Sequence, residues 1–241
     1  MGKATFWAFV AASSLFVGAG IAIALRPSQR VIGLVMAFGA GALISAVAYD
    51  LVLEALDHAD GPALAAGMAA GGLTFVAGDY LISRGGGGGR KRSTGEQAEG
   101  APLAIVLGAA LDGVPESIVL GLSVLLGGTV STSFLVATFL SNLPEAMAAT
   151  AGLQRAGWRR GGIWGLWSVV VAISTVSAAI GYAVFQGAPA ATGALVQAFA
   201  AGAVITMLAD TMMPEAFEFG GRAVGLCTLA GFVVALTISA P

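Results

Sequence analysis

Eight runs of apolar residues, each about long enough to cross a lipid bilayer as a helix, occupy most of this chain. A transmembrane helix needs roughly 20 predominantly apolar residues. Only 10% of the residues are charged, against about 25% in a typical soluble domain, so the chain could not cover a water-facing surface. This pattern predicts an all-α membrane protein with eight transmembrane helices, built as one domain over residues 1–241. The runs cover residues 5–25, 31–56, 62–82, 102–126, 130–152, 162–186, 190–217 and 222–240.

The one long polar segment, at about residues 83–101, lies between the third and fourth apolar runs. It contains five consecutive glycines followed by Arg90, Lys91 and Arg92. Glycine-rich, charged sequence is typical of a flexible linker, so we expect a flexible loop here. The segment lacks the Gly-x4-Gly-Lys order of a phosphate-binding loop. From the apolar runs we expect the lipid bilayer as a partner of this chain, and we expect no nucleic acid.

The basic residues are distributed unevenly between the two ends of the predicted helices. Loops after the second, fourth and sixth runs contain no Lys or Arg. The positive-inside rule assigns the basic side to the cytoplasm, which predicts a multi-pass protein of the plasma (inner) membrane with both termini outside. Ten of the eleven basic residues fall on that side: Arg26, Arg30, Arg84, Arg90, Lys91, Arg92, Arg155, Arg159, Arg160 and Arg222.

Two stretches of the chain resemble each other in sequence. Aligning Gly41 with Gly202 matches GALISAVAYDLVLEA to GAVITMLADTMMPEA and pairs Glu54 with Glu215. The second run would go outward and the seventh inward, so the repeat would be inverted. Inverted repeats are found in many secondary transporters; a chance likeness between helices rich in Ala and Gly is the alternative.

Acidic residues occur within the predicted transmembrane runs without Lys, Arg or His beside them. A charge at the centre of a membrane helix costs about 2.5–3.5 kcal/mol on insertion scales, and no basic side chain is placed to offset that cost. The carboxyl groups must therefore be protonated, hydrated or compensated by a bound cation. There are nine such residues, of which Asp79 and Glu218 lie near run ends and are expected to reach the interface: Asp50, Glu54, Asp79, Asp112, Glu116, Glu145, Asp210, Glu215 and Glu218.

The fourth and fifth runs carry similar Pro-Glu motifs. The fourth reads Asp112-Gly-Val-Pro-Glu116 and the fifth Ser141-Asn142-Leu-Pro-Glu145. Residues four apart share a helix face, so each motif places a carboxylate beside a second oxygen-bearing side chain. Oxygen ligands suit hard or borderline divalent cations. Together the two motifs predict an oxygen-rich metal site between the fourth and fifth helices.

The prolines of these motifs support the same interpretation. Pro115 and Pro144 each remove a helix hydrogen bond and free the carbonyl group four residues earlier. Such kinks are tolerated in membranes where the backbone lines a polar cavity. The alternative is that both prolines are packing kinks and that Glu116 and Glu145 are neutral, hydrogen-bonded structural groups.

Acidic residues of the second and seventh runs are further candidates. Asp50 is either a metal ligand or a structural residue. Glu54, Asp210 and Glu215 are candidates for a gate or for proton handling, with a structural role as the alternative. His58, the only histidine, lies in an acidic loop after the second run. No nucleophile–base arrangement indicates catalysis, so we do not expect an enzyme.

These motifs resemble those of the ZIP (Zrt-, Irt-like) family of divalent metal transporters, in a bacterial-type form with divergent metal-site motifs. Family members typically read His-Asn-x-Pro-Glu-Gly in the fourth span and His-x-x-Pro-Glu in the fifth. Asp112 and Ser141 stand here at the two His positions, and Gly113 stands at the Asn position. The Asp50–Glu54 and Asp210–Ala216 stretches resemble the family's second-span and seventh-span patterns.

The resemblance implies eight spans in a 3+2+3 arrangement with inverted repeats and a cytoplasmic loop between spans three and four. It also implies metal uptake by alternating access, elevator-like sliding of one helical bundle, and a homodimer. The transported substrate would be a divalent metal ion, Zn2+ by resemblance, bound by Asp112, Glu116, Asn142, Glu145, Ser141 and Asp50.

Departures from the family pattern give the predicted site more hard oxygen ligands and fewer nitrogen ligands than family members usually have. Both motif histidines are replaced by oxygen-bearing residues, and Ser174 stands where members often place a Glu in span six. Zn2+ gains much from nitrogen and sulfur ligands, so Mn2+, Fe2+ or Mg2+ stay open as substrates. Two other functions also stay open: a proton-coupled carrier of another small substrate, and a transport-inactive, metal-sensing relative.

Overall fold

The computed structural model describes residues 1–87, 92–95, 102–127 and 130–239, and every regular element within these ranges is a helix. The prediction of an all-α fold is therefore confirmed for the described part of the chain. The first half contains α1 (Gly2–Leu25), α2 (Gln29–Ala46), the π-helical segment η1 (Val47–Leu53), α3 (Glu54–Leu56), α4 (Gly61–Ile82) and η2 (Ser83–Gly87). The second half contains α5 (Pro102–Gly127), α6 (Thr132–Arg155), α7 (Arg160–Phe185), α8 (Ala190–Met207), the π-helical segment η4 (Leu208–Met212), α9 (Met213–Gly220), the 3-10 turn η5 (Gly221–Ala223) and α10 (Val224–Ser239).

Polar caps and glycine turns set several helix ends. The side chains of Ser28, Asp60 and Ser131 accept hydrogen bonds from backbone N–H groups in the first turns of α2, α4 and α6, at 3.4, 2.8 and 3.2 Å. Such caps satisfy N–H groups that have no partner inside the helix. Gly157 and Gly187, just after α6 and α7, have φ values of 83° and 85°, a conformation that glycine adopts without steric cost. Short turns of this kind return the chain directly into the next helix.

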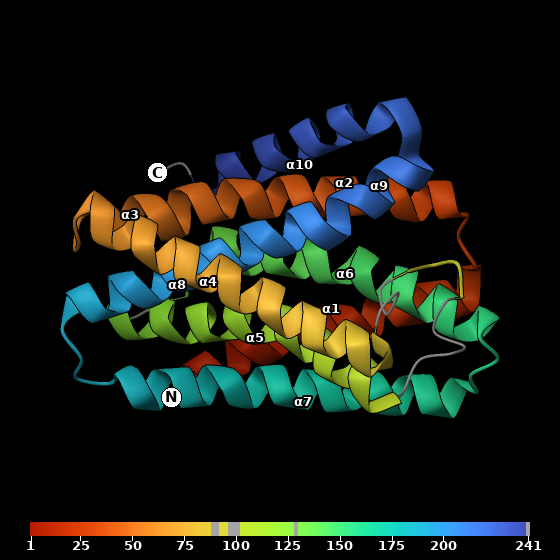
Figure 1. Cartoon of the computed structure of the whole chain (residues 1–241), viewed down its shortest axis with the longest axis horizontal. Coiled ribbons are helices and arrows are strands. Elements are labelled where there is room, and N and C mark those ends of the chain that lie inside the picture. Colours follow the sequence, from red (N-terminus) through yellow and green to blue (C-terminus); the bar gives the residue numbers. More distant parts are fainter. Residues whose placement is uncertain (88–91, 96–101, 128–129, 240–241) are drawn as a thin grey trace.

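Six helical stretches in the described residues are long and apolar enough to cross a membrane: Gly2–Leu25, Gln29–Leu56, Gly61–Gly86, Leu103–Leu125, Arg160–Phe185 and Ala190–Ser239. This finding supports the prediction of a membrane protein with several spanning helices. The helix α6 is long enough but more polar, since it carries Ser141, Asn142 and Glu145. The Ala190–Ser239 stretch turns back on itself after α9 (Figure 1). The count of eight spans therefore stays a prediction.

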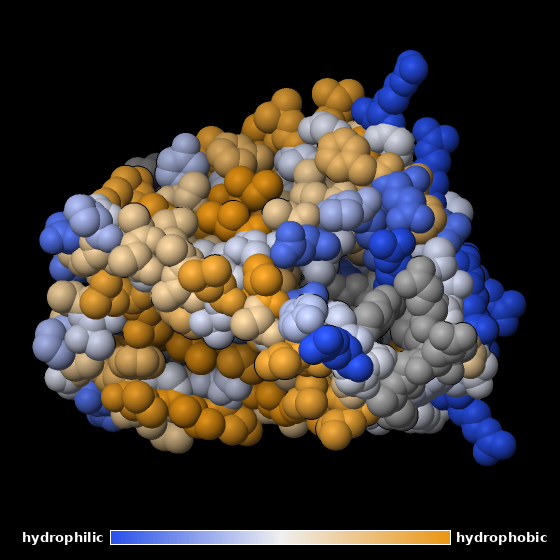
Figure 2. All heavy atoms as spheres, viewed as in Figure 1, coloured by the Kyte–Doolittle hydropathy of each residue, from blue (hydrophilic) through white to orange (hydrophobic). Residues whose placement is uncertain are grey.

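The long helices run side by side along the longest axis of the molecule, with the chain reversing direction at each turn (Figure 1). Both termini lie at one end, and the turns after α1, α6 and α9 lie at the other (Figure 1). Arg26, Arg155, Arg160 and Arg222 flank those turns, so we call this the arginine end and the opposite one the terminal end. A largely apolar surface lies between the two polar ends (Figure 2).

Two hydrophobic cores and a small cluster of Ala55, Leu64, Ala194 and Ala198 hold the described helices together. The larger core joins α2, α8, α9 and α10 with the inner sides of α5 and α6. The second core lies among α1, α6 and α7 around the fully buried Trp167. The indole N–H of Trp167 donates a 2.9 Å hydrogen bond to the hydroxyl oxygen of Thr150, which satisfies the polar atom of an otherwise apolar side chain. Hence α6 belongs to both cores and links them.

Glycines allow α2 and α10 to pack backbone against backbone. A Cβ atom added at Gly41 would lie well within 3.0 Å of the Thr228 carbonyl oxygen, and one added at Gly231 would collide in the same way with the Phe38 carbonyl. Membrane helices often pack through small residues because lipid supplies no hydrophobic drive between them. The two helices therefore approach each other through reciprocal glycine contacts.

The helices α4 and α8 repeat this contact at the aligned positions of the chain. A Cβ at Gly202 would collide with the Met68 carbonyl, and one at Gly71 would collide with the Phe199 carbonyl. Gly202 is the residue that the sequence alignment pairs with Gly41, and Phe199 and Phe38 each stand three residues before the aligned glycine. The aligned stretches thus make matching contacts.

The local helix geometry also matches between the two stretches. The π-helical segments η1 and η4 each begin six residues after the aligned glycine, at Val47 and Leu208. The helices α2 and α8 run in opposite directions (Figure 1). The sequence likeness between the two stretches is therefore accompanied by a likeness in structure and an inverted orientation.

Replacing Gly41 by Ala should lower the thermal stability of the protein, because the new methyl group would push α10 away from α2. Overpacking of this kind typically costs about 1–3 kcal/mol. The matched control is Gly165→Ala, since an added Cβ at this exposed site in α7 meets nothing within 4 Å and removes only the helix penalty of glycine. Thermal unfolding of both variants in the same detergent measures the difference. Equal melting temperatures would contradict the close α2–α10 contact.

Part of the predicted flexible loop is held against the arginine end. Ser93 is fully buried, its N–H donates a 2.8 Å hydrogen bond to Glu215, and its carbonyl accepts one from Arg155. Arg92 forms a 3.0 Å salt bridge with Glu218. Residues 92–95 are thus tied to α6 and α9. Residues 88–91 and 96–101 lie outside the described residues, so the flexibility predicted for the loop stays a prediction.

Candidate functional site

Three acidic side chains of α5 and α6 lie inside the helical bundle. The exposed fractions of Asp112, Glu116 and Glu145 are 3, 2 and 5%. Asp112 and Glu116 are one turn apart on α5, and Glu145 lies near the middle of α6. Carboxyl groups are almost never buried to this degree unless they are paired, protonated or bound to a metal. These three residues are the centre of the candidate site.

The prolines of both motifs lie inside continuous helices. Pro115 is within α5 and Pro144 is within α6, as the kink interpretation requires. Next to Pro115 there is a cavity of about 410 Å3 between α4, α5 and α8, and its lining is apolar except for Thr74. This cavity therefore suits lipid or detergent chains rather than a cation, and the polar side of α5 lies elsewhere.

A serine from α7 adjoins the α5 motif. A Cβ atom built on Gly113 would lie 3.0 Å from the hydroxyl oxygen of Ser174, and Ser174 is 3% exposed. Since Gly113 has no side chain, α7 can bring this hydroxyl next to the residue that follows Asp112. The sequence resemblance selected Ser174 by position, and the structure places it beside the motif.

On α6, Asn142 and Ser141 differ in whether their side-chain oxygen is available to a cation. Ser141 is fully buried, and its hydroxyl donates a 3.0 Å hydrogen bond to the Thr138 carbonyl of its own helix. A Cβ on Gly39 of α2 would lie 2.9 Å from the Ser141 Cα and 2.7 Å from the Leu140 carbonyl oxygen, which is the carbonyl that Pro144 cannot bond. This freed carbonyl is thus covered by α2. Asn142, 8% exposed, is the better placed oxygen donor of the motif.

The acids of the two motifs are held by different neighbours. The helix α5 packs closely on α7, and α6 packs closely on α1 and α2, whereas α5 and α6 make few close approaches to each other. Within the described part of the chain, no group of three or more His, Cys, Asp or Glu side chains is gathered as a metal site. A site shared by α5 and α6 would therefore need the helices or the side chains to close around the ion.

Asp50 and Glu54 lie toward the terminal end. The Asp50 carboxylate accepts hydrogen bonds from Ser133 at 2.6 Å and from Ser239 at 3.4 Å. Ser133 and Glu145 are 12 residues apart on α6, which corresponds to about 18 Å along a helix. The structure thus does not bring Asp50 together with the acids of α5 and α6. Glu54 is within 3.5 Å of the Gln197 amide nitrogen of α8.

Glu215 and Asp210 lie in the opposite repeat. Glu215, 4% exposed, accepts the backbone hydrogen bond from Ser93 near the arginine end. Asp210 is exposed and belongs to the π-helical segment η4. Of the two, only Glu215 lies inside the protein, where it joins α9 to the loop segment at residues 92–95.

Several buried polar residues were not found by sequence reasoning. Gln197 is 1% exposed and Thr138 is 2% exposed. Among the described residues, Gln197 Oε1, Thr138 Oγ1 and Ser45 Oγ have no hydrogen-bond partner. The available signal was a single polar residue in an otherwise apolar run, which is common in membrane helices and is weaker than a carboxylate. Thr138 matters most, because it lies one turn from Asn142 on α6.

Comparison with known proteins leaves the chain without an assigned family. No family model matches it, and no curated protein is detectably similar to it.

Proposed function

We propose that this protein transports divalent metal cations across a membrane, as its resemblance to ZIP transporters suggests. The observation that carries the proposal is the burial of Asp112, Glu116 and Glu145, each at most 5% exposed, in the middle of helices that form an apolar bundle. The described basic residues lie at helix ends or, in the case of Arg92, in the loop segment at residues 92–95. A transiently bound cation compensates carboxylates that are buried at the centre of membrane helices.

The donors point to a hard or borderline ion. The substrate site consists of Asp112, Glu116 and Glu145, with Asn142 and Ser174 as neutral oxygen donors. Carboxylate, amide and hydroxyl oxygens suit Mn2+, Mg2+ and Fe2+ and are accepted by Zn2+. A loose arrangement is compatible with transport, because an ion must leave the site as readily as it enters. The family resemblance favours Zn2+, and the oxygen donors leave Mn2+, Fe2+ and Mg2+ as competing substrates.

A polar stripe along α6 gives the ion a route. Thr138, Asn142 and Glu145 follow one another at spacings of four and three residues, so they lie along one side of the helix. The stripe begins at Thr138 and ends at the acid of the Pro-Glu motif. Beyond it, residues 146–149 are Ala, Met, Ala and Ala. The proposed route therefore leads to the buried carboxylates from the half of α6 nearer the terminal end, and the Ser133–Asp50 pair lies on another face of α6.

We further propose eight membrane crossings in a 3+2+3 arrangement with inverted repeats. The Ala190–Ser239 stretch has 50 residues, about 75 Å of helix, which is enough to cross a hydrocarbon core of about 30 Å twice. The six apolar stretches then give seven crossings. The helix α6, whose mid-helix polar residues are buried, adds the eighth. The arginine end would face the cytoplasm of the inner membrane by the positive-inside rule, with both termini outside.

Glu54 and Glu215 are proposed as gate residues of the two repeats. They occupy aligned positions, directly after and shortly after the π-helical segments η1 and η4. Glu54 meets Gln197 toward the terminal end, and Glu215 meets Ser93 near the arginine end. Alternating access requires that one end opens while the other stays closed. Matched carboxylates at opposite ends suit that requirement.

Flux into proteoliposomes tests the proposed function. The purified protein is reconstituted into liposomes that contain a metal-sensitive dye or, separately, a pH-sensitive dye, and Mn2+ or Zn2+ is added outside. We expect a metal signal well above that of empty liposomes. Metal binding without flux would indicate a sensor instead, and proton flux that is independent of metal would indicate a carrier of another substrate.

A further inference from the structure

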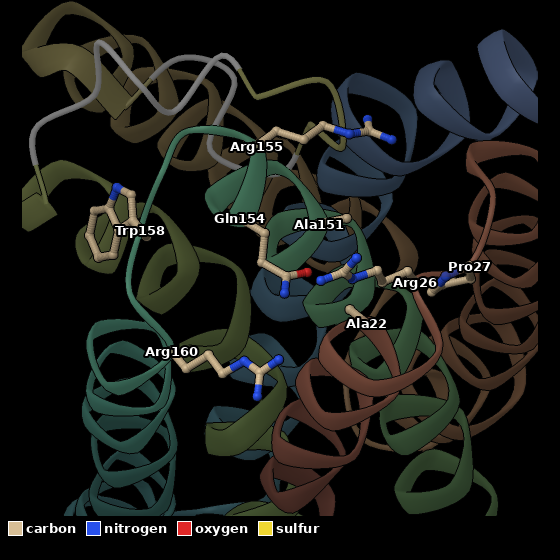
Figure 3. Close-up of a pocket in the computed structure, with 8 residues that line it drawn as sticks. All are labelled: Ala22, Arg26, Pro27, Ala151, Gln154, Arg155, Trp158 and Arg160. Carbon is tan, nitrogen blue, oxygen red and sulfur yellow. The ribbon is translucent and has the colours of Figure 1, made fainter.

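A basic cavity of about 430 Å3 lies at the arginine end, between the last turn of α1, the end of α6 and the start of α7. Arg26, Arg155 and Arg160 line it together with Gln154 and Trp158. Figure 3 shows Arg26, Gln154 and Arg160 around the same space, with the guanidinium group of Arg155 turned away from it. The cavity is separate from the acids of α5 and α6, and nothing in the proposed transport route uses it.

The described residues that line this cavity do not balance its positive charge. Among them there is no carboxylate, and in the described part of the chain Arg26 and Arg160 have no acidic partner. The guanidinium group of Arg155 donates to the carbonyl oxygen of Ser93. Arg155 therefore lines the cavity mainly with its aliphatic carbons, and its positive charge adds to the electrostatic potential there. Guanidinium groups bind phosphate oxygens with charge-assisted and often paired hydrogen bonds. Two uncommitted arginines in one concave space thus indicate an anionic ligand with several oxygen atoms.

Backbone geometry reinforces this preference. The helix α7 begins at Arg160, and its N-cap residue, Arg159, makes no side-chain cap, so N–H groups of the first turn are available to an anion. Arg26 has φ = 48° and is the one non-glycine residue with positive φ in the described ranges. That conformation is uncommon for a residue with a side chain. Arg26 is the C-terminal cap residue of α1, and its side chain lines the cavity.

The surroundings favour a lipid as the source of the anion. Trp158 lines the cavity, and tryptophan is enriched where membrane proteins meet the lipid headgroups. One turn from Arg160 on α7, Trp164 is 38% exposed, and its ring lies 6.0 Å from that of Phe16 on α1. Basic pockets between membrane helices bind anionic headgroups, and the exposed Trp164 ring with the half-buried Phe16 ring beside it offers an apolar contact next to this pocket.

We propose that the basic cavity binds a phosphate group, supplied by the headgroup of an anionic phospholipid whose acyl chain lies over Trp164 and Phe16. Arg26 and Arg160 hold the phosphate oxygens, and the first turn of α7 adds backbone N–H donors. A soluble phosphate compound would meet the same donors but would lack the apolar contact. This site lies at the surface of the protein, and lipid binding there does not depend on metal transport.

The test compares Arg26→Gln plus Arg160→Gln with a matched control, Arg30→Gln plus Arg222→Gln. The control removes the same charge from exposed arginines that do not line the cavity. Native mass spectrometry and thermal shift in detergent measure binding of phosphatidylglycerol, phosphatidylcholine and glycerol 3-phosphate. We expect parent and control to bind phosphatidylglycerol most tightly and the cavity variant to bind it about tenfold or more weakly.

Each outcome decides a separate part of the inference. Equal phosphatidylglycerol affinity in the parent and the cavity variant would overturn it. Glycerol 3-phosphate binding as tight as the lipid, and lost in the cavity variant, would support the phosphate site but overturn the lipid source. If the cavity variant melts well below the control, Arg26→Lys plus Arg160→Lys takes its place, because Lys keeps the positive charge but cannot form paired hydrogen bonds. Weaker phosphatidylglycerol binding by this variant would support paired guanidinium–phosphate contacts, and unchanged binding would contradict them.

Discussion

Replacing Glu116 and Glu145 by Gln together should weaken binding of Mn2+ or Zn2+ by about 100-fold or more. Both carboxylates are almost completely buried, and Gln keeps the size of Glu while removing the charge that attracts the cation. Titration of the purified protein with each metal, followed by calorimetry, measures the affinity. Proteoliposome flux should fall to the level of empty liposomes.

The melting temperature of the double variant shows whether weaker metal binding reflects a lost site or a lost fold. Thermal unfolding without metal shows whether the double variant keeps the fold, because Gln retains the size and much of the hydrogen-bonding capacity of Glu. The parent should gain stability on adding metal, because a ligand that binds the folded state stabilises it, and the variant should not. Asp57→Asn, in the exposed loop after α3, is the matched control and should behave as the parent. A double variant that binds metal as the parent does would remove Glu116 and Glu145 from the site.

Asp112→His should shift the metal preference toward Zn2+ by roughly tenfold relative to Mn2+. The substitution exchanges an oxygen ligand for an imidazole nitrogen, and nitrogen ligands favour Zn2+ over Mn2+ in the usual affinity order. Competition binding of the two metals to the parent and the variant measures the shift. An unchanged ratio would mean that Asp112 does not line the metal site.

Asp112 is a better position for this test than Ser141. Ser141 is fully buried, its hydroxyl bonds its own helix, and the backbone around it packs against Gly39, so an imidazole there would disturb the α2–α6 contact.

The metal affinity of the parent should also fall as the pH falls, since protons compete with the cation for the carboxylates. An affinity that does not depend on pH would contradict carboxylate ligands.

The helical part of the fold could be predicted from the sequence because apolar runs of this length have few alternatives. Helices occupy each of the predicted runs in the described residues, although the number that cross a membrane is not established by length and composition alone. The likeness between the stretches at Gly41 and Gly202 was visible in sequence, and its physical reason is the close backbone contact that each glycine permits.

The local details of the fold could not be predicted in this way. The π-helical geometry of η1 and η4 depends on contacts with neighbouring helices, and no residue type specifies it. The burial of Ser93 depends on Gln29, Arg155 and Glu215, which are far from it in sequence. A polar, glycine-rich segment carries no signal for such contacts.

The candidate site was predicted in part. The spacing of Asp112 and Glu116 predicts a shared helix face, because helix periodicity is local, and both side chains are buried on α5; their role in a metal site stays a prediction. The pairing of Asp50 with Ser133 and Ser239 and the exposure of Asp210 are tertiary facts, and a carboxylate in an apolar run looks the same in each case. Thr138 and Gln197 were missed because hydroxyl and amide side chains are common in membrane helices.

Anomalous X-ray scattering from crystals soaked in Mn2+ or Cd2+ tests the central claim most directly, because it locates the ion. The account predicts a peak between α5 and α6, within coordination distance of Glu116 and Glu145 and close to Asp112 or Asn142. A peak only at the acidic loop around His58, or no peak within the helical bundle at metal concentrations that saturate binding, would contradict a substrate site formed by the buried carboxylates.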